Sequence, residues 1–208
     1  MSAKTDVIQK CLWSVCLVGL FIPDTLSLDC DLLGNHLYRL TWRNLRFLNS
    51  RNNSFPVECL RESKAFELPQ EILSYTQPLK RDIKEAFYEI SKQTFNIFSQ
   101  YTFQSTWDKK HLIQIQIGLD QQLHYLEQCL KEEDMENEDV TEMAEDERKH
   151  PGATVPQMTK LKLKRYFRRI DSFLKDKKFS HCALEIIRLE LIRCFYYFQK
   201  FTAFLRRK

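Results

Sequence analysis

Apolar side chains recur at spacings of three and four residues in five stretches of this chain. In the first stretch, Leu33, Leu37, Leu40, Leu45 and Leu48 fall on one face of a helix with 3.6 residues per turn. The other stretches repeat the pattern with leucine, isoleucine, phenylalanine and tyrosine. The periodicity therefore predicts five helices, over residues 32–49, 78–101, 107–130, 159–176 and from residue 180 onward.

The residues that flank these stretches fit helix ends. Pro78 suits the first turn of the second helix, while Asp108 and Ser180 are of the type that caps helix N-termini. Glycine is scarce, with four in the whole chain, which disfavours the tight turns of a β-rich fold. We expect an all-α bundle. The loop over residues 50–77 is long enough for the first two helices to be parallel, in an up-up-down-down arrangement.

The last predicted helix carries two kinds of side chain. Its apolar seam consists of Leu184, Ile187, Leu191, Phe195 and Phe198. Beside the seam lies a stripe with the mixture of arginine, aliphatic and aromatic residues that is typical of protein interfaces. This stripe consists of Arg188, Leu189, Ile192, Arg193 and Tyr196. We expect the stripe to be exposed and to bind a protein; the alternative is a helix buried on nearly all sides.

The N-terminus has the pattern of a secretory signal peptide. The apolar run at residues 11–22 is shorter than a membrane-spanning helix, and small residues follow it up to Ser27. We expect a signal peptide over residues 1–27, a helical domain over residues 28–208, and hence a secreted, extracellular protein. The alternative, an N-terminal membrane anchor, is disfavoured by the short run.

Five cysteines remain after that cut: Cys30, Cys59, Cys129, Cys182 and Cys194. None belongs to a Cys-x-x-Cys pair and no histidine has zinc-finger spacing, so the sequence indicates no metal site. In an oxidising compartment they fit two disulfides and one free thiol, and the sequence alone does not say which four pair. Cys194 is the best candidate for the free thiol because it lies in the middle of a helix.

The first long loop also carries a modification signal. Asn52-Asn53-Ser54 matches the acceptor for N-glycosylation, so we expect a glycan on Asn52 in a secreted chain. The alternative is an acceptor that stays unused.

Charge is unevenly spread along the chain. The net charge of +4 is mild and does not indicate binding to nucleic acid. Residues 132–147 are strongly acidic and lack aromatics, which predicts a mobile loop. Residues 160–178 are strongly basic but keep apolar residues at helical intervals, so they fit the solvated face of a helix. That face could also bind an acidic partner or a cell-surface polyanion.

Two other classes of function are disfavoured. A helical hydrolase would need a motif such as His-Glu-x-x-His, Gly-x-Ser-x-Gly or a phosphate loop; the chain has none, and its five histidines are scattered. A secreted carrier of an apolar ligand would need a cavity, whereas the many large aliphatic and aromatic residues indicate a filled core. No cofactor is indicated.

Several segments together resemble the type I interferons over nearly all of the chain after the signal peptide. They are residues 28–32 (LDCDL), 59–71 (CLRESKAFELPQE), 95–99 (FNIFS), 164–170 (KRYFRRI) and 174–188 (LKDKKFSHCALEIIR). Their order, their spacing and the surroundings of two cysteines all agree with that family.

The resemblance implies a secreted five-helix cytokine that is not an enzyme. Such a cytokine bridges two receptor chains, the interferon-α/β receptor subunits 1 and 2, and starts Janus kinase/STAT signalling toward an antiviral state. The resemblance also implies the disulfides Cys30–Cys129 and Cys59–Cys182.

The resemblance further implies two receptor-binding surfaces. The residues that match the surface for the high-affinity chain are Leu60, Ser63, Lys64, Arg188, Leu189, Ile192, Arg193 and Tyr196. Those that match the surface for the low-affinity chain are Phe95, Asn96, Gln100, His111, Gln116, Asp120 and Lys164. We expect Arg188 and Arg193 to make the main electrostatic contacts to the high-affinity chain. Phe95 lies about 120° from the seam of its own helix, and the alternative for it is a contact at the edge of the core.

Two parts of these surfaces depart from the family pattern. A loop arginine of many relatives is Ser63 here, followed by Lys64, and neither side chain offers the guanidinium fork. Positions that are aromatic in relatives are Gln116 and Asp120. We therefore expect weaker receptor binding than in the strongest family members, and tighter binding after Ser63→Arg.

Overall fold

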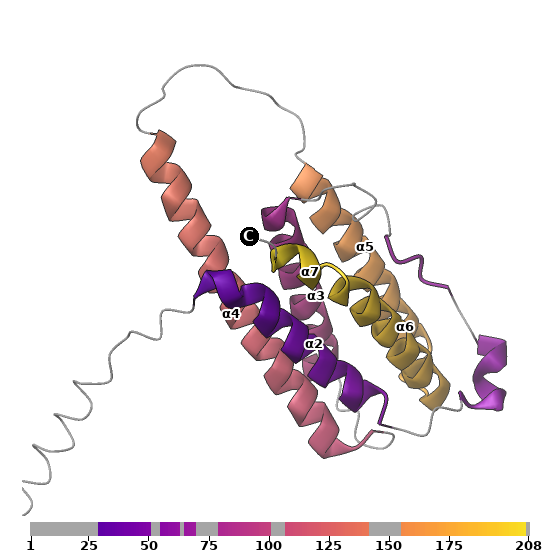
Figure 1. The fold of residues 1–208 in the computed structure, drawn as a ribbon. Coiled ribbons are helices and arrows are strands. Elements are labelled where there is room, and N and C mark those ends of the chain that lie inside the picture. The colour runs from indigo at the N-terminus through magenta and orange to yellow at the C-terminus, as the bar shows by residue number, and fades with distance from the viewer. Residues whose placement is uncertain are drawn as a thin grey trace, which may run out of the picture.

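The computed structural model describes residues 29–50, 55–62, 65–69, 79–100, 107–141 and 155–206, with backbone only for residues 100, 136–141 and 155–157. All regular structure in these ranges is helical, as expected for an all-α protein (Figure 1). The elements are η1 (Cys30–Leu32), α2 (Leu33–Leu48), η2 (Val57–Glu62), α3 (Lys80–Gln100), α4 (Lys109–Thr141), α5 (Val155–Asp176), α6 (His181–Gln199) and α7 (Thr202–Leu205). The expected signal peptide and Asn52 lie outside the described residues.

Helices α2 and α3 both run antiparallel to α4. At one end of the bundle, the Cys30–Cys129 disulfide joins η1, directly before the start of α2, to the later part of α4. The ion pair between Lys84 and Glu133 joins the start of α3 to the same part of α4. At the other end, Gln116 near the start of α4 donates a 3.0 Å hydrogen bond to a backbone carbonyl near the end of α3. The first two long helices are therefore parallel, which requires the long crossover between them.

The five long helices form a closed ring around one core. Around this ring α2 contacts α4, α4 contacts α3, α3 contacts α5, α5 contacts α6, and α6 returns to α2 (Figure 1). Helix α6 is antiparallel to α2. Arg188, in the first half of α6, reaches the last residue of α2, whereas α7, which follows the end of α6, lies against Gly34 near the start of α2. The up-up-down-down bundle is thus confirmed, with α2 and α3 in one direction, α4 and α6 in the other, and α5 added beside α3.

The predicted seams supply most of the core. All five leucines of the first seam are buried, and so are Tyr166, Phe167, Ile170, Phe173 and Leu174 of α5. Leu161, at the start of the same helix, is exposed instead. The crossover adds Phe66 and Leu68, and the ring of Phe66 packs edge-on against Phe173. The crossover is therefore anchored in the core as well as by its disulfide.

Two of the predicted helix caps are present. The Ser180 hydroxyl accepts a 3.2 Å hydrogen bond from the backbone N–H of Ala183 at the start of α6. One oxygen of Asp108 accepts from the N–H groups of Lys110 and His111 at the start of α4, and these two bonds hold the pKa of the Asp108 carboxyl below its usual value.

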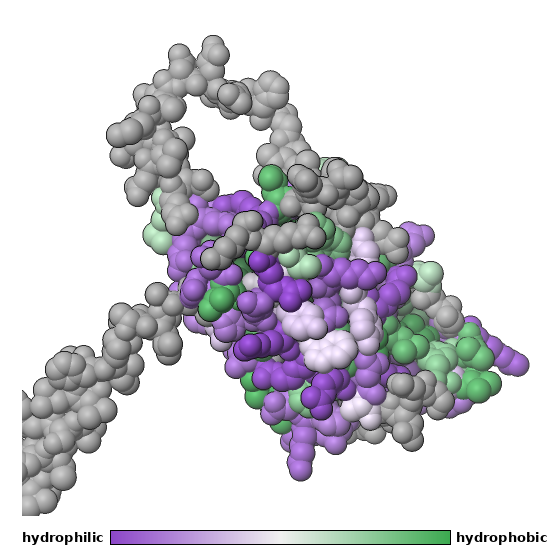
Figure 2. Space-filling model, in the orientation of Figure 1, coloured by the Kyte–Doolittle hydropathy of each residue, from purple (hydrophilic) through white to green (hydrophobic). Residues whose placement is uncertain are grey.

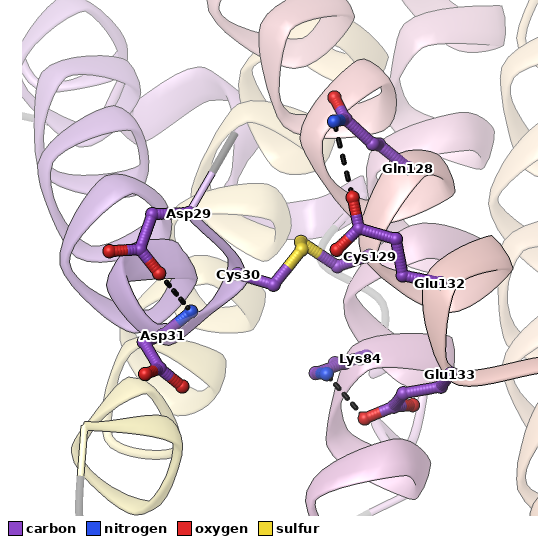
Figure 3. Close-up of a disulfide and its surroundings, with 8 residues drawn as sticks. All are labelled: Asp29, Cys30, Asp31, Lys84, Gln128, Cys129, Glu132 and Glu133. Carbon is purple, nitrogen blue, oxygen red and sulfur yellow. Dashed lines mark hydrogen bonds and ion pairs between the residues drawn. A yellow bond between two sulfur atoms is a disulfide. The ribbon is translucent and has the colours of Figure 1, made fainter. Parts of the chain in front are cut away.

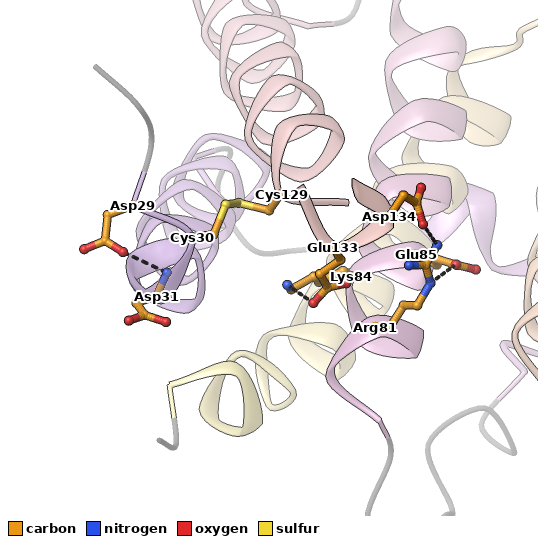
Figure 4. A network of polar contacts seen from close by, with 9 residues as sticks. All are labelled: Asp29, Cys30, Asp31, Arg81, Lys84, Glu85, Cys129, Glu133 and Asp134. Atoms are coloured by element: carbon orange, nitrogen blue, oxygen red, sulfur yellow. Dashed lines mark hydrogen bonds and ion pairs between the residues drawn. A yellow bond between two sulfur atoms is a disulfide. The ribbon is translucent and has the colours of Figure 1, made fainter. Parts of the chain in front are cut away.

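The expected acidic loop is wrong in its first part. Residues 132–141 continue α4, which runs to Thr141 instead of ending near residue 130. Two of the acidic side chains there, Glu133 and Asp134, pair with basic side chains of α3. Arg81 pairs with Asp134 at 2.7 Å and with Glu85 in its own helix at 3.1 Å, next to the Lys84–Glu133 pair (Figure 4). Glutamate is a good helix former, and pairing with basic side chains of α3 balances part of the acidic charge. Both effects favour a helix in this segment.

The disulfide and these ion pairs lie at the same end of the bundle. Figure 3 shows Cys30 reaching Cys129 on α4, with Lys84 and Glu133 close by. None of the helices in the described ranges combines the length and the apolar character needed to cross a bilayer.

Candidate functional site

The Cys59–Cys182 disulfide brings the crossover to the start of α6. The two Cα atoms are 5.0 Å apart, and η2 packs against α6 around them. Cys59 is fully buried, while its neighbour Leu60 leaves 58% of its surface exposed. Figure 2 shows hydrophobic side chains gathered at the corner of the molecule where η2 lies. The disulfide thus holds an exposed apolar corner beside α6.

Helix α6 exposes only a narrow line of side chains. Leu189 and Tyr196 are 40% and 44% exposed, and the side chain of Arg193 is 49% exposed. Spacings of four and three put these residues in one line along the helix. Arginine and tyrosine are enriched in protein-binding surfaces, and the exposed leucine adds apolar area between them and η2.

The expectation that Arg188 and Ile192 share this exposed line is wrong. They are 2% and 9% exposed, so α6 is buried on most of its circumference, close to the alternative described above. Arg188 donates from Nε to Glu185 at 2.9 Å and from Nη1 to the backbone carbonyl of Leu48 at 3.0 Å. The reason is the neighbouring helix: α2 covers this flank of α6, which periodicity along α6 could not show.

Arg193 is held by a second acidic residue of the same helix. Glu190 accepts from Nη2 of Arg193 and from the hydroxyl of Tyr166, both at 2.7 Å and both on Oε1. The carboxylate raises the pKa of Arg193, and burial raises the pKa of Tyr166 well above its usual value. Arg193 is therefore always charged, and the Glu190 carboxylate fixes the position of this half-exposed side chain.

Two exposed aromatic residues of α2 were missed by the sequence reasoning. Tyr38 and Trp42 are 39% and 46% exposed, and the guanidinium of Arg206 lies 5.0 Å from the Tyr38 ring. Both lie outside the leucine seam of α2 and are four residues apart. Two aromatic residues on one face, away from the seam, were the signal in the sequence for an exposed aromatic pair. Since α2 packs on α6, these two side chains are candidates for the same surface. Ser63 and Lys64, also expected on this surface, lie outside the described residues.

The structure groups only part of the second expected surface. Asn96 of α3 and Lys164 of α5 line one cleft of roughly 410 Å³, together with Gln93, Arg168, Asp171 and Lys175. Phe95 is half-buried and packs against the edge of the core, in agreement with its alternative interpretation. The side chain of Gln100 lies outside the described residues.

The expected residues of α4 do not form one group. Asp120 is exposed, and Gln116 is tied to α3 through the carbonyl of Phe98 at 3.0 Å. His111 instead faces the end of α2, where its Nδ1 is 2.9 Å from the hydroxyl of Ser50 and its ring packs on Phe47. His111 therefore belongs to the α2–α4 contact rather than to the side of α4 next to α3.

Both disulfides implied by the resemblance are present, and Cys194 is free and buried. Burial raises the pKa of the Cys194 thiol far above its usual value. Glu58, Cys59 and His181 bring three potential metal ligands together. The Cys59 sulfur is in a disulfide and cannot act as a thiolate, so we assign no metal to them.

The clefts of the described residues do not resemble an apolar carrier site. The cleft between α3 and α5 is lined mainly by charged and amide side chains. A second cleft of roughly 260 Å³, next to Cys30–Cys129, is lined by Lys80, Lys84, Glu132 and Glu133 among others. A lipid-like ligand favours mostly apolar walls, so the carrier alternative gains no support.

A ring of helices with parallel first and second members, a long anchored crossover and two disulfides defines a four-helix-type cytokine with an added helix. Residues 33–205 match the family model described as the interferon alpha/beta domain, and the chain therefore belongs to the type I interferon family, whose members are cytokines and not enzymes.

Individual relatives agree with this assignment. The chain is 65% identical to human interferon kappa over 208 residues, which is all of both chains. It is 32% identical to human interferon beta over 198 residues, which is 95% of this chain and 98% of the relative. Among solved structures, zebrafish interferon 2 matches with a TM-score of 0.63 over 78% of this chain and 97% of its own, at 20% identity, which supports the fold.

Proposed function

We propose that this chain is a secreted interferon that bridges the interferon-α/β receptor subunits 1 and 2. Bridging would start Janus kinase/STAT signalling and lead to an antiviral state. Membership of the type I interferon family supports the proposal at the level of the class. The main observation in support of the receptor contact is the line of exposed side chains on α6, next to η2, which the Cys59–Cys182 disulfide holds in place.

The high-affinity contact centres on side chains that are exposed and fixed in place. Leu60 and Leu189 offer the apolar centre, Tyr196 an aromatic contact, and Arg193 a positive charge. The disulfide and the Glu190 carboxylate hold this surface before a partner arrives, so little ordering entropy is lost on binding. Tyr38 and Trp42 extend the surface across α2.

Binding of the purified chain to the isolated ectodomains of the two receptor subunits tests the proposal. Truncation of a central anchor costs about 2 kcal/mol or more, so we expect Leu189→Ala and Arg193→Ala to weaken high-affinity binding about thirtyfold. Arg81→Ala is the matched control, because Arg81 also pairs with a glutamate of its own helix but lies at the start of α3. If both α6 variants stay folded and bind like the parent, the contact lies elsewhere.

The low-affinity contact is assigned to the cleft between α3 and α5. Asn96 and Lys164 come from different helices and line it together, which supports a shared role. We expect Lys164→Ala to weaken binding of the low-affinity ectodomain while binding of the high-affinity ectodomain stays at the level of the parent.

Secretion and glycosylation are part of the same proposal. The intact mass of protein from the medium of expressing cells should correspond to a chain that begins at Leu28. Glycosidase treatment should lower that mass through loss of a glycan from Asn52. A mass that includes residues 1–27, or one unchanged by the enzyme, would contradict the respective prediction.

A cell-surface polyanion is a second candidate partner. Lys160, Lys164, Arg165 and Arg168 are all exposed on α5, and Lys175 follows on the same helix. Asp171 pairs with Lys175 at 2.7 Å and offsets part of this charge. Retention on a column of sulfated polysaccharide should weaken steeply with salt and fall further after Arg165 and Arg168 are both replaced by alanine.

A further inference from the structure

Three carbonyl groups in the last turn of α2 have hydrogen-bond partners outside the helix ladder. The last turn of any α-helix leaves carbonyl oxygens without partners in the helix. Here Leu45 and Phe47 accept from the backbone N–H groups of Asn49 and Ser50. The carbonyl of Leu48 accepts instead from Nη1 of Arg188, at 3.0 Å, across the interface between α2 and α6. A side chain 140 residues later in the chain thus caps this helix.

The pair that makes this contact is almost completely buried. The side chains of Arg188 and Glu185 are 3% and 5% exposed, and their 2.9 Å ion pair aims the guanidinium at Leu48. Burial of an ion pair costs desolvation, so such a pair is weak evidence for added stability. It does fix geometry, because a planar guanidinium bonded on two sides permits few other arrangements of the two helices.

The helices joined in this way carry the two halves of the candidate surface. Trp42 lies six residues before Leu48, and Tyr196 lies eight residues after Arg188. At 1.5 Å per residue they stand about 9 and 12 Å along their antiparallel helices from the Arg188 contact. They therefore come to similar levels on adjoining helices, and both side chains are nearly half exposed. The relative position of α2 and α6 therefore decides whether they form one surface.

We propose that Arg188 is a positioning residue. It holds the end of α2 against α6, so that Trp42 and Tyr38 of one helix and Leu189 and Tyr196 of the other meet the high-affinity receptor chain as one surface. Arg188 itself is too buried to touch that chain in this arrangement. This inference rests on the proposed receptor contact and changes the role that Arg188 has within it.

Amide hydrogen exchange of the free full-length protein gives the first test. Arg188→Lys keeps the charge but cannot reach both partners in a fixed plane. We expect exchange of the amides in the last turn of α2 to rise about tenfold, as after loss of a hydrogen bond to a charged donor. Arg193→Lys is the matched control on the same helix, with a glutamate three residues before it, and should leave exchange in α2 unchanged. Should Arg188→Lys fail to fold, Glu185→Gln gives the same test, with a smaller rise expected.

A double-mutant cycle on receptor binding gives the second test. Arg188→Lys should weaken high-affinity binding about tenfold in the parent, but clearly less when Trp42 is already alanine, because both changes disturb the same surface. Binding of the low-affinity ectodomain should not change, which separates positioning from general unfolding. Additive effects together with unchanged exchange in α2 would overturn the proposal in favour of direct contact. Absence of any binding by the parent would instead overturn the proposed function, while the exchange result still reports on the α2–α6 contact.

Discussion

Helix α6 contains the same local arrangement twice, and the two copies have different surroundings. Glu185 pairs with Arg188 at 2.9 Å, and five residues later Glu190 pairs with Arg193 at 2.7 Å. The first pair is buried under α2, and its arginine donates a hydrogen bond to the carbonyl of Leu48. In the second pair the glutamate is buried and bonded to Tyr166, whereas the arginine is half exposed.

The difference between the two pairs shows how one helix can hold its neighbours and also present a surface. The first arginine has all its directed contacts inside the molecule, so its loss would remove the cation paired with the buried Glu185 carboxylate and the donor to the Leu48 carbonyl. The second arginine is fixed at its base but keeps part of its guanidinium in solvent. We therefore expect stability to depend on the first pair and receptor binding to depend directly on the second.

The largest contrast should appear when each arginine is removed. Removing one partner of a buried ion pair costs about 3–5 kcal/mol, so Arg188→Ala should lower the free energy of unfolding by this amount. Arg193→Ala should cost about 1 kcal/mol or less, since its side chain is half exposed. Urea unfolding measures both, and similar losses for the two variants would contradict the assignment of roles.

A second difference between the surroundings of the two pairs should appear at alkaline pH, because the second pair adjoins Tyr166 and the thiol of Cys194. Burial raises the pKa of the Cys194 thiol, so the native thiol stays protonated where the thiol of the unfolded chain ionises. Stability from this group is complete below about pH 8.5 and is lost at about 1.4 kcal/mol per pH unit above it. Tyr166 adds to the loss above about pH 10 in the same way.

Thermal unfolding between pH 8 and 11 measures this loss. Cys194→Ala should show a shallower fall with pH than the parent, whereas Arg188→Lys should show the same slope as the parent from a lower starting point. Equal slopes for the parent and Cys194→Ala would show that the thiol is accessible or already ionised in the native protein.

A smaller effect is expected from the tyrosine that supports the second pair. Tyr166→Phe removes the 2.7 Å bond to Glu190 and leaves that carboxylate with Arg193 alone. Loss of a hydrogen bond to a charged group costs about 1.5–3 kcal/mol, and we expect the lower end because Arg193 remains. Receptor binding should stay within about twofold of the parent; a large loss of binding would mean that Tyr166 and not Arg193 governs the surface.

The smallest effect concerns salt. An exposed ion pair is screened at high ionic strength and a buried one is screened much less. The loss of stability caused by Arg193→Ala should shrink by a few tenths of a kcal/mol between low salt and 1 M NaCl, while the loss caused by Arg188→Ala should stay constant. Unfolding curves at both salt concentrations decide this, and a salt effect of equal size in both variants would contradict the difference in burial.

Much of the fold follows from the sequence because it depends on short-range rules. The leucine seam of α2, the caps at Asp108 and Ser180, and the position of Cys194 in the middle of a helix can all be recognised within a few residues. The pairing of the other four cysteines required more, namely the resemblance of their surroundings to a known family. The exposed residues Leu189, Arg193 and Tyr196 were likewise predicted by pattern and resemblance together, and the exposed Leu60 by the resemblance alone.

Only the tertiary structure decided what lies beside each seam. Residues 188 and 193 both flank the apolar seam of α6, yet α2 covers the first and leaves the second in solvent. In the same way, residues 132–141 read as a loop until Arg81 and Lys84 of α3 are placed opposite Asp134 and Glu133. Periodicity reports the direction of a side chain from its own helix axis. Whether that direction meets water, a cation or a neighbouring backbone depends on residues far away in the chain, and this is what packing of the helices determined.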